Sequence, residues 1–183
     1  MIKMKDRLKV KVSRYMSYLL RHNPENLKMN VEGFVDFKEL LENVRKHFRV
    51  CRELIIEIVE ESDRKRFELV EDKIRALYGH TIPVELEFEE EKLIKILYHG
   101  TTPEAASEIL GKGLKPMKRR WVHLSPSIET AKLVGLRRTD KPVILQIDVE
   151  KARKDHVKFY KATENVYLCR LIEPEHITRA FHI

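Results

Sequence analysis

The stretch RFELVEDKIRAL, residues 66–77, sets the interpretation of the first half of this 183-residue chain. Two short runs that alternate apolar and polar residues flank the polar pair Glu71-Asp72, and this pattern predicts a β-hairpin. Three segments before it repeat apolar residues at helical spacing, which predicts three helices. The apolar positions of these helices are Val12, Tyr15, Met16, Leu19, Leu20, Leu40, Leu41, Val44, Phe48, Leu54, Ile55, Ile58 and Val59.

Start and stop signals place the helices more closely. The first is expected to begin near Ser13 and to stop before Pro24, and Asp36 is expected to open the second. Three helices followed by a hairpin is the order of a winged helix, so residues 1–82 are predicted to form a winged-helix lobe. Because residues 1–22 are almost free of acids, this lobe is expected to bind nucleic acid. A winged helix used only for protein contacts is the alternative.

The remainder of the chain has a different pattern of apolar and polar residues. Val84, Leu86 and Phe88 alternate like a strand ahead of an acidic run, and we place a linker at residues 83–92. Residues 93–183 combine short strand-like runs with two helices inserted early, which predicts an α+β lobe around a central PVILQIDV strand. The predicted strands are KILYHGT (95–101), RWVHLS (120–125), PVILQIDV (142–149), DHVKFYKAT (155–163), NVYLCRLI (165–172) and ITRAFHI (177–183), and the helices start at Thr102-Pro103 and Ser125-Pro126.

Composition narrows the possible functions. The chain has 36 Lys and Arg against 29 Asp and Glu, a net charge of +7 that favours a polyanionic partner. No apolar run approaches the roughly 20 residues that span a bilayer, so we expect a cytoplasmic protein with no membrane contact and no obligate protein partner. Cys51 and Cys169 lie far apart without a CxxC pair, and no metal site is predicted. Glycine-rich nucleotide-binding fingerprints are absent from the sequence.

The candidates for chemistry are arginines and histidines. An arginine fork binds phosphate oxygens in pairs and stays charged, so such a site suits phosphate chemistry, although a lone arginine can also serve a helix dipole. In LYHGT, the glycine allows close approach of a ligand, and His99 and Thr101 can hydrogen-bond a ribose. An ordinary strand-to-helix turn is the other interpretation. The candidates are Arg21, His22, Arg75, His99, His123 and Arg137.

The chain resembles the RNA 2′-phosphotransferases, the KptA family, in six ordered stretches that span nearly its whole length. These stretches are SYLLRH (17–22), RALYGHT (75–81), LYHGT (97–101), VHLS (122–125), VGLR (134–137) and ATENVYL (162–168). The resemblance implies a winged-helix RNA-binding lobe, an ADP-ribosyltransferase-like NAD-binding lobe and an active cleft between them. It also implies that an internal 2′-phosphate of RNA, of the kind left at tRNA splice junctions, is transferred to NAD.

The resemblance assigns site residues position by position. The catalytic residues it implies are Arg21, His22, Arg75 and Arg137. Those that would bind NAD, which is consumed as a co-substrate without any metal, are His99, Gly100, Thr101, His123 and Ser125. The chain departs from the family pattern at Trp121, where histidine is common, and at Arg138-Thr139, where His-Gly is common. These departures bear on the nucleotide preference.

The reaction implied by the resemblance has two steps. A phosphate oxygen attacks C1″ of the nicotinamide ribose, and nicotinamide leaves a 2′-phospho-ADP-ribosylated RNA. The ribose O2″ then attacks phosphorus, which gives an RNA 2′-OH and ADP-ribose 1″,2″-cyclic phosphate, while arginines stabilise the phosphoryl charge. His22 either protonates the departing RNA oxygen or only hydrogen-bonds the phosphate.

Two alternatives remain open. One is an ADP-ribosyltransferase that modifies nucleic-acid terminal phosphates or a protein. Protein-modifying relatives commonly activate the acceptor with a late glutamate, and here Glu164 is present although the position near Val166 is apolar. The other is a winged-helix nucleic-acid-binding protein whose second lobe only senses a ligand. Release of nicotinamide from NAD in the presence of phosphorylated RNA would separate it from the enzymes.

Overall fold

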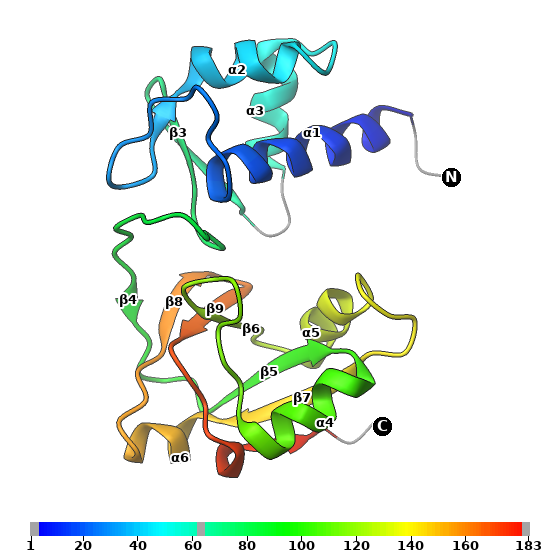
Figure 1. The fold of residues 1–183 in the computed structure, drawn as a ribbon, viewed down its shortest axis with the longest axis vertical. Helices are drawn as coiled ribbons and strands as arrows, with labels where there is room; N and C mark the ends of the chain where they lie inside the picture. Colours follow the sequence, from blue (N-terminus) through cyan, green and yellow to red (C-terminus); the bar gives the residue numbers. More distant parts are fainter. Residues whose placement is uncertain (1–3, 62–64, 181–183) are drawn as a thin grey trace. The chain divides into compact units, whose positions relative to one another are not determined.

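The computed structural model describes residues 4–61 and 65–180, in two compact units with the bounds Met1–Glu87 (unit 1) and Phe88–Ile183 (unit 2). Each unit has its own core, and the mixture of helices and sheets makes the protein α+β (Figure 1). The division falls at the acidic segment in which the linker was predicted. None of the described helices is both long and apolar enough to cross a membrane.

Unit 1 contains the three helices and the hairpin that the apolar pattern predicts. Its three-stranded antiparallel sheet has the order β1-β3-β2, and the hairpin pairs Phe67 with Ala76 and Val70 with Lys73. The short strand β1 was not predicted. The elements are α1 (Met4–Arg21), β1 (Val35–Asp36), α2 (Phe37–Arg45), α3 (Arg52–Glu60), β2 (Phe67–Val70) and β3 (Lys73–Ala76).

Local chemistry explains where these helices begin and end. Asp36 caps α2 as predicted, because its carboxylate accepts a hydrogen bond from Glu39 N at 2.9 Å. The predicted start of the first helix near Ser13 is wrong, since α1 begins at Met4. Good helix formers extend it, and Ser13 is buried within the helix, where its hydroxyl accepts a hydrogen bond from Arg66 at 2.9 Å.

The strand predicted from Val84, Leu86 and Phe88 is wrong. This segment is irregular up to β4, Glu89–Glu90. Val84 is buried, and its side chain packs 3.4 Å from the position that a Cβ on Gly33 would take. The alternation therefore reflects the packing of a loop rather than a pleated strand.

Unit 2 contains two antiparallel sheets, of order β10-β7-β5 and β4-β8-β9-β6 (Figure 1). As predicted, the PVILQIDV stretch supplies a central strand, β7. Its buried core includes Leu97, Leu145, Ile147 and Phe159. The elements after β4 are β5 (Ile96–Thr101), α4 (Pro103–Lys112), β6 (Val122–Leu124), α5 (Ile128–Gly135), β7 (Val143–Asp148), α6 (Val149–Lys154), β8 (Tyr160–Thr163), β9 (Val166–Cys169), η1 (Pro174–His176) and β10 (Ile177–Arg179).

The caps of unit 2 confirm one predicted helix start and correct another. Thr102 caps α4 with Pro103 in its first turn, as predicted. Helix α5 starts two residues later than predicted, because Ser127, not Ser125, caps it by accepting from Thr130 N at 3.2 Å. Helix α6 was not predicted, and the last residues of the predicted strand 177–183 lie outside the described residues.

A pair of backbone hydrogen bonds connects the two sheets of unit 2. Tyr98 N donates to Ser125 O and Ser125 N donates to Tyr98 O, both at 2.8 Å. Tyr98 belongs to β5, and Ser125 directly follows β6, so the bridge brings the HGT and HLS motifs together although their strands belong to different sheets.

Candidate functional site

In unit 1, the end of α1 contacts the segment Tyr78–Ile82. Thr81 N and Ile82 N donate to Arg21 O at 2.9 and 3.5 Å. The His22 ring lies 3.1 Å from the Thr81 hydroxyl, measured from Nδ1 to Oγ1. The Arg-His pair and the Gly-His-Thr motif, about 60 residues apart in sequence, therefore lie in contact.

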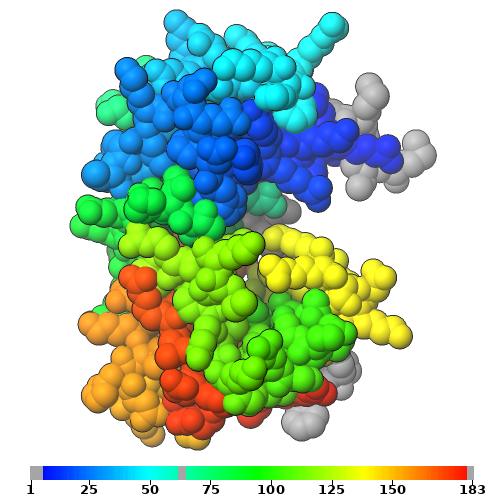
Figure 2. Space-filling view, in the orientation of Figure 1, coloured from blue at the N-terminus to red at the C-terminus, as the bar shows by residue number. Residues whose placement is uncertain are grey.

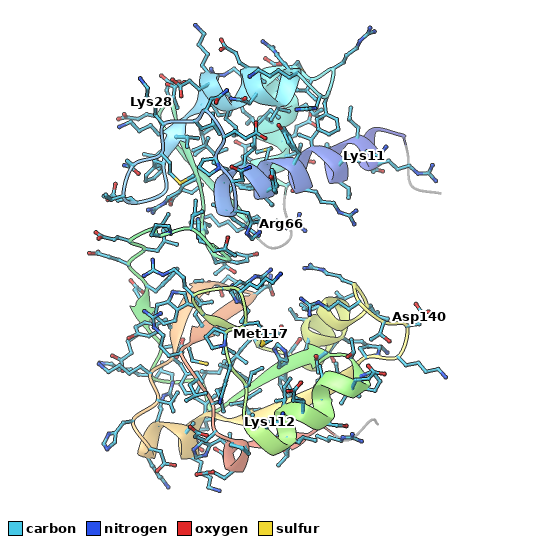
Figure 3. All side chains as sticks on the ribbon, viewed as in Figure 1. Lys11, Lys28, Arg66, Lys112, Met117 and Asp140 are labelled. Atoms are coloured by element: carbon cyan, nitrogen blue, oxygen red, sulfur yellow. The ribbon has the colours of Figure 1, made fainter. Side chains whose placement is uncertain are left out.

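The guanidinium of Arg21 lies in a mostly buried aromatic setting. It stands 4.8 Å from the centroid of the Tyr78 ring and 5.9 Å from that of Phe67, and Nη2 donates to Arg66 O at 3.4 Å (Arg66 is labelled in Figure 3). Gly79, at φ +90°, allows the chain to pass close to this side chain. A cation over aromatic faces is held with little rotational freedom, so Arg21 is pre-oriented.

Arg75 has a different set of partners. Its Nε and Nη2 both donate to Glu68 Oε2, at 2.8 and 2.7 Å, across the β2–β3 ladder. The guanidinium stands 4.3 Å from the Phe34 ring centroid, and Nη1 donates to Glu32 O at 3.4 Å. The structure thus places Arg75 in an ion pair of its own hairpin, apart from the hydrogen bonds of Arg21 and His22.

In unit 2, His99 bonds to the main chain of the neighbouring strand. Its Nδ1 lies 3.0 Å from His123 O, and because a carbonyl oxygen only accepts, Nδ1 carries the proton. Burial lowers the pKa of His99, and the charge of Arg138 lowers it further against the effect of this hydrogen bond. The ring is therefore neutral at pH 7, with Nε2 as an acceptor.

The His and Ser of the HLS motif are also bonded to the main chain. His123 Nδ1 donates to Trp121 O at 2.9 Å, so this nitrogen carries a proton, as Nδ1 of His99 does. Ser125 is buried and holds the bridge to Tyr98. Two histidines and a serine are thus brought together at the junction of β5 and β6.

Gly100 and Thr101 are both buried at the end of β5. A Cβ on Gly100 would lie only 1.9 Å from Ala131 O of helix α5, and a Cβ on Gly135 of that helix would lie 2.5 Å from Pro142 and 3.4 Å from Gly100 in β5. We expected the glycine of HGT to allow a ligand to approach. The structure shows that the close approach here is between strand and helix.

Arg137 follows the end of α5 and is exposed; its N–H donates to Val134 O at 3.3 Å. The next residue, Arg138, is the one whose charge acts on His99. The VGLRR stretch is thereby connected to the HGT motif in unit 2. From the sequence, Arg138 was considered only as a departure from the family pattern. Thr81 of unit 1 was also not selected, although the Gly-His-Thr motif that contains Thr81 could have indicated it.

A separate group with metal-ligand chemistry lies at the end of α6 and in η1. Among the described residues, Asp155, Glu175 and His176 are the one set whose ligand atoms lie within 4.8 Å of each other. His176 Nε2 is already 3.0 Å from Asp155 Oδ2. The group includes none of the predicted site residues, and the expectation that the reaction needs no metal remains a prediction.

Comparison with known proteins agrees with this distribution of motifs. The model of the RNA 2′-phosphotransferase, Tpt1 / KptA family, matches residues 7–171, which include every predicted site residue. The chain belongs to this family.

Relatives named "Probable RNA 2′-phosphotransferase" are similar over nearly the full length of both proteins. The protein of Pyrococcus abyssi is 42% identical over 168 residues, which cover 90% of this chain and 92% of the relative. That of Thermococcus kodakarensis is 43% identical and covers 93% and 96%. That of Bacillus thuringiensis subsp. konkukian is 41% identical and covers 94% and 96%.

Proposed function

We propose that this protein is an NAD-dependent RNA 2′-phosphotransferase. It transfers an internal RNA 2′-phosphate, of the kind left at tRNA splice junctions, to NAD and yields an RNA 2′-OH, nicotinamide and ADP-ribose 1″,2″-cyclic phosphate. The observation that carries the proposal is the convergence of motifs in a chain of this family: Arg-His with Gly-His-Thr in unit 1, and HGT with HLS in unit 2.

The two units would have separate tasks. Unit 1 would act as the winged-helix RNA-binding lobe, and its Arg21, His22 and Arg75 would bind the 2′-phosphate. A phosphate monoester carries roughly two negative charges, one more than an internucleotide phosphodiester, so several arginines select for it. Arg75 already binds a carboxylate oxygen through two N–H groups, the geometry that it would offer to a phosphate. Arg137 of unit 2 would contribute a further positive charge.

Unit 2 would act as the ADP-ribosyltransferase-like NAD-binding lobe. NAD supplies an electrophilic C1″ with nicotinamide as the leaving group. The fit of unit 2 to NAD rests on His99. Its Nδ1 donates to a main-chain carbonyl, so Nε2 of the neutral ring can accept a hydrogen bond from a ribose hydroxyl. His123 likewise donates from Nδ1, and the buried Thr101 and Ser125, each two residues after one of these histidines, add hydroxyl groups.

These residues also fit the chemistry of the two steps. The first step breaks a bond to a good leaving group, so positioning of the phosphate oxygen matters more than a general base. In the second step charge accumulates on phosphoryl oxygens, where fixed guanidinium donors are most effective. His22, exposed and bonded to a hydroxyl, would donate to the phosphate or to the departing RNA 2′-oxygen.

A protein acceptor is less well supported than a phosphate. It would need a carboxylate that activates a nucleophile, and Glu164 is the candidate in the late motif. Glu164 is 85% exposed and forms an ion pair with Lys161 at 2.7 Å, while the nearby Val166 is buried. This carboxylate is therefore engaged at the surface.

The test is to incubate the full chain with NAD and a short RNA that bears one internal 2′-phosphate. We expect loss of that phosphate together with nicotinamide release, and neither change when the RNA lacks the 2′-phosphate. Nicotinamide release with the phosphate retained on a stable ADP-ribosylated product would favour the ADP-ribosyltransferase. Absence of both reactions would overturn the proposal.

A further inference from the structure

The segment between α4 and β6 is unusually basic. Residues 109–128 contain no aspartate or glutamate, although more than a third of the whole chain is charged. We call residues 115–121, KPMKRRW, the basic loop. Its Met117 is 92% exposed and is labelled in Figure 3, and the yellow-green atoms of the loop lie at the surface in Figure 2. None of the site residues described above belongs to this loop.

Arg170, directly after β9, is stacked on the last residue of the loop. Its guanidinium carbon stands 3.7 Å from the Trp121 ring centroid, and Nη1 donates to Arg120 O at 3.0 Å. The Trp121 ring in turn packs edge-on against Tyr160 at 5.3 Å and Phe88 at 6.1 Å. The loop is thus held against unit 2, and Arg170, which is exposed, has a fixed orientation before any ligand arrives.

Three of the positive charges on this surface have no acidic partner among the described residues. Within residues 4–61 and 65–180, Lys115, Lys118 and Arg170 form no ion pair with a carboxylate. Nearby lysines differ, since Lys112 pairs with Glu108 at 3.2 Å and Lys158 approaches Glu90 at 4.0 Å. A set of exposed cations without acidic partners attracts a polyanion.

We infer that the basic loop and Arg170 bind a single-stranded stretch of the RNA substrate that flanks the phosphorylated nucleotide. The inference rests on the proposed function for the choice of RNA as substrate. Lys115 and Lys118 contact backbone phosphates. Arg170 has one face on Trp121, so its other face and its remaining N–H groups serve a base or a phosphate, the combination of cation and π-stacking typical of single-strand sites.

The test measures binding of the full chain to a fluorescent single-stranded RNA that has no 2′-phosphate, without NAD, over a series of salt concentrations. The double variant Lys115→Ala, Lys118→Ala removes two phosphate contacts, so its salt slope falls by about 1.4, because each contact to a single strand contributes roughly 0.7. The matched control is Lys112→Ala, Lys158→Ala, which removes the same charge from lysines with acidic neighbours. We expect this control to bind as the wild type does.

Two substitutions of Arg170 distinguish the contribution of its charge to RNA binding from that of stacking. Arg170→Lys keeps the charge and loses the planar group, so its salt slope should stay the same while Kd rises several-fold; Arg170→Ala should lower the slope as well. Equal binding by the lysine pair variant and the wild type would overturn the inference. So would competition by polyglutamate as strong as that by RNA, which would mark a general anion surface.

The same variants distinguish this inference from the proposed function. On a long RNA with an internal 2′-phosphate, KM for RNA should rise while kcat and KM for NAD stay unchanged; on a minimal 2′-phosphorylated dinucleotide, no change is expected. RNA binding through the loop without any loss of 2′-phosphate would contradict the proposed function alone. Loss of the 2′-phosphate with RNA binding independent of the loop would contradict this inference alone.

Discussion

In unit 1 two of the candidate phosphate ligands, His22 and Arg75, bond to other side chains, whereas in unit 2 the candidate histidines bond to main-chain carbonyls. His22 bonds to the Thr81 hydroxyl, and Arg75 bonds to the Glu68 carboxylate. A phosphate can replace either partner, because a hydroxyl and a carboxylate offer the same kind of acceptor oxygen. Unit 1 therefore has contacts that a substrate can exchange.

The partners in unit 2 cannot be exchanged in this way. The carbonyls that accept from His99 and His123 belong to β6 and the residue before it, and they move only if the strand moves. A fixed tautomer and ring orientation come at no cost when a ligand binds. Under the proposed function, the ribose site of unit 2 would be preformed and the phosphate site of unit 1 would be adjustable.

The largest expected effect concerns the close packing that unit 2 needs. Gly100→Ala places a Cβ 1.9 Å from the backbone oxygen of Ala131, so strand and helix must separate, and we expect a loss of about 3 kcal/mol or more in the free energy of unfolding. Gly111→Ala is the matched control, because a Cβ there meets nothing within 4 Å and alanine favours the helix. Urea unfolding followed by circular dichroism measures both; equal stability of Gly100→Ala and wild type would contradict the close approach of β5 to α5.

The next largest effect concerns the arginines. Loss of one charge-assisted contact to the phosphate costs about 1.5–3 kcal/mol, so Arg21→Ala, Arg75→Ala and Arg137→Ala should each slow removal of the RNA 2′-phosphate by roughly tenfold to a hundredfold or more. ADP-ribosylated RNA should accumulate, because the second step depends more on these charges. Lysine should rescue poorly, since it lacks the fork.

Arg52→Ala is the control for these arginine variants, because it removes an exposed guanidinium from unit 1 that lies 3.5 Å from Asp72. Single-turnover assays with 2′-phosphorylated RNA measure all four proteins. Near-normal rates for the three site variants would show that these arginines do not bind the reacting phosphate.

A smaller effect should appear in the pH dependence of stability. The folded protein keeps His99 neutral, because burial and Arg138 lower its pKa below the usual 6.5. Between that lowered value and 6.5 the unfolded chain binds more protons, so stability falls as the pH drops through this window and levels off below it. Urea unfolding at several pH values should show a weaker dependence in His99→Asn. A profile identical to that of the wild type would exclude His99 as its source.

The smallest effect tests whether the ion pair of unit 1 is exchangeable. Glu68→Gln removes the charge that competes for Arg75 in a pair whose side chains are 23% and 30% exposed. We expect a stability loss of only about 0.5 kcal/mol, typical of a surface pair, and a lower KM for RNA. Glu57→Gln, which removes an acidic partner of Lys9 on the same unit, is the control. A raised KM in Glu68→Gln would instead show that Glu68 orients Arg75 for the substrate.

Much of the fold follows from periodicity and caps in the sequence. The apolar spacing gave the three helices of unit 1, and Asp36 and Thr102 gave two helix starts correctly. The errors arise where tertiary contacts decide. Ser13 can cap a helix or lie within one, and only its contact with Arg66 distinguishes the two. Likewise Val84 belongs to an alternating apolar pattern that is typical of a strand, but it is buried because its side chain packs against Gly33 in a loop.

The candidate site was less accessible to this reasoning. Motif residues could be named, but their contacts depend on elements far apart in the chain. That Arg75 pairs with Glu68 follows from the hairpin register, and that Arg138 acts on His99 follows from the packing of α5 on β5. The first is implicit in the predicted Glu71-Asp72 turn, which sets Glu68 opposite Arg75, whereas the second leaves no mark in local spacing. Which site residues have exchangeable partners and which have fixed ones therefore follows only from the folded structure.

The bridge between Tyr98 and Ser125 also has a consequence for the kinetics of folding. Its two hydrogen bonds join the edges of two sheets, and each sheet pairs strands that are distant in sequence, such as β5 with β7 and β6 with β9. Non-local pairing is slow, because the chain must close long loops first. The amide protons of Tyr98 and Ser125 should thus be among the last to gain protection from solvent exchange during refolding, later than those of the β2–β3 hairpin.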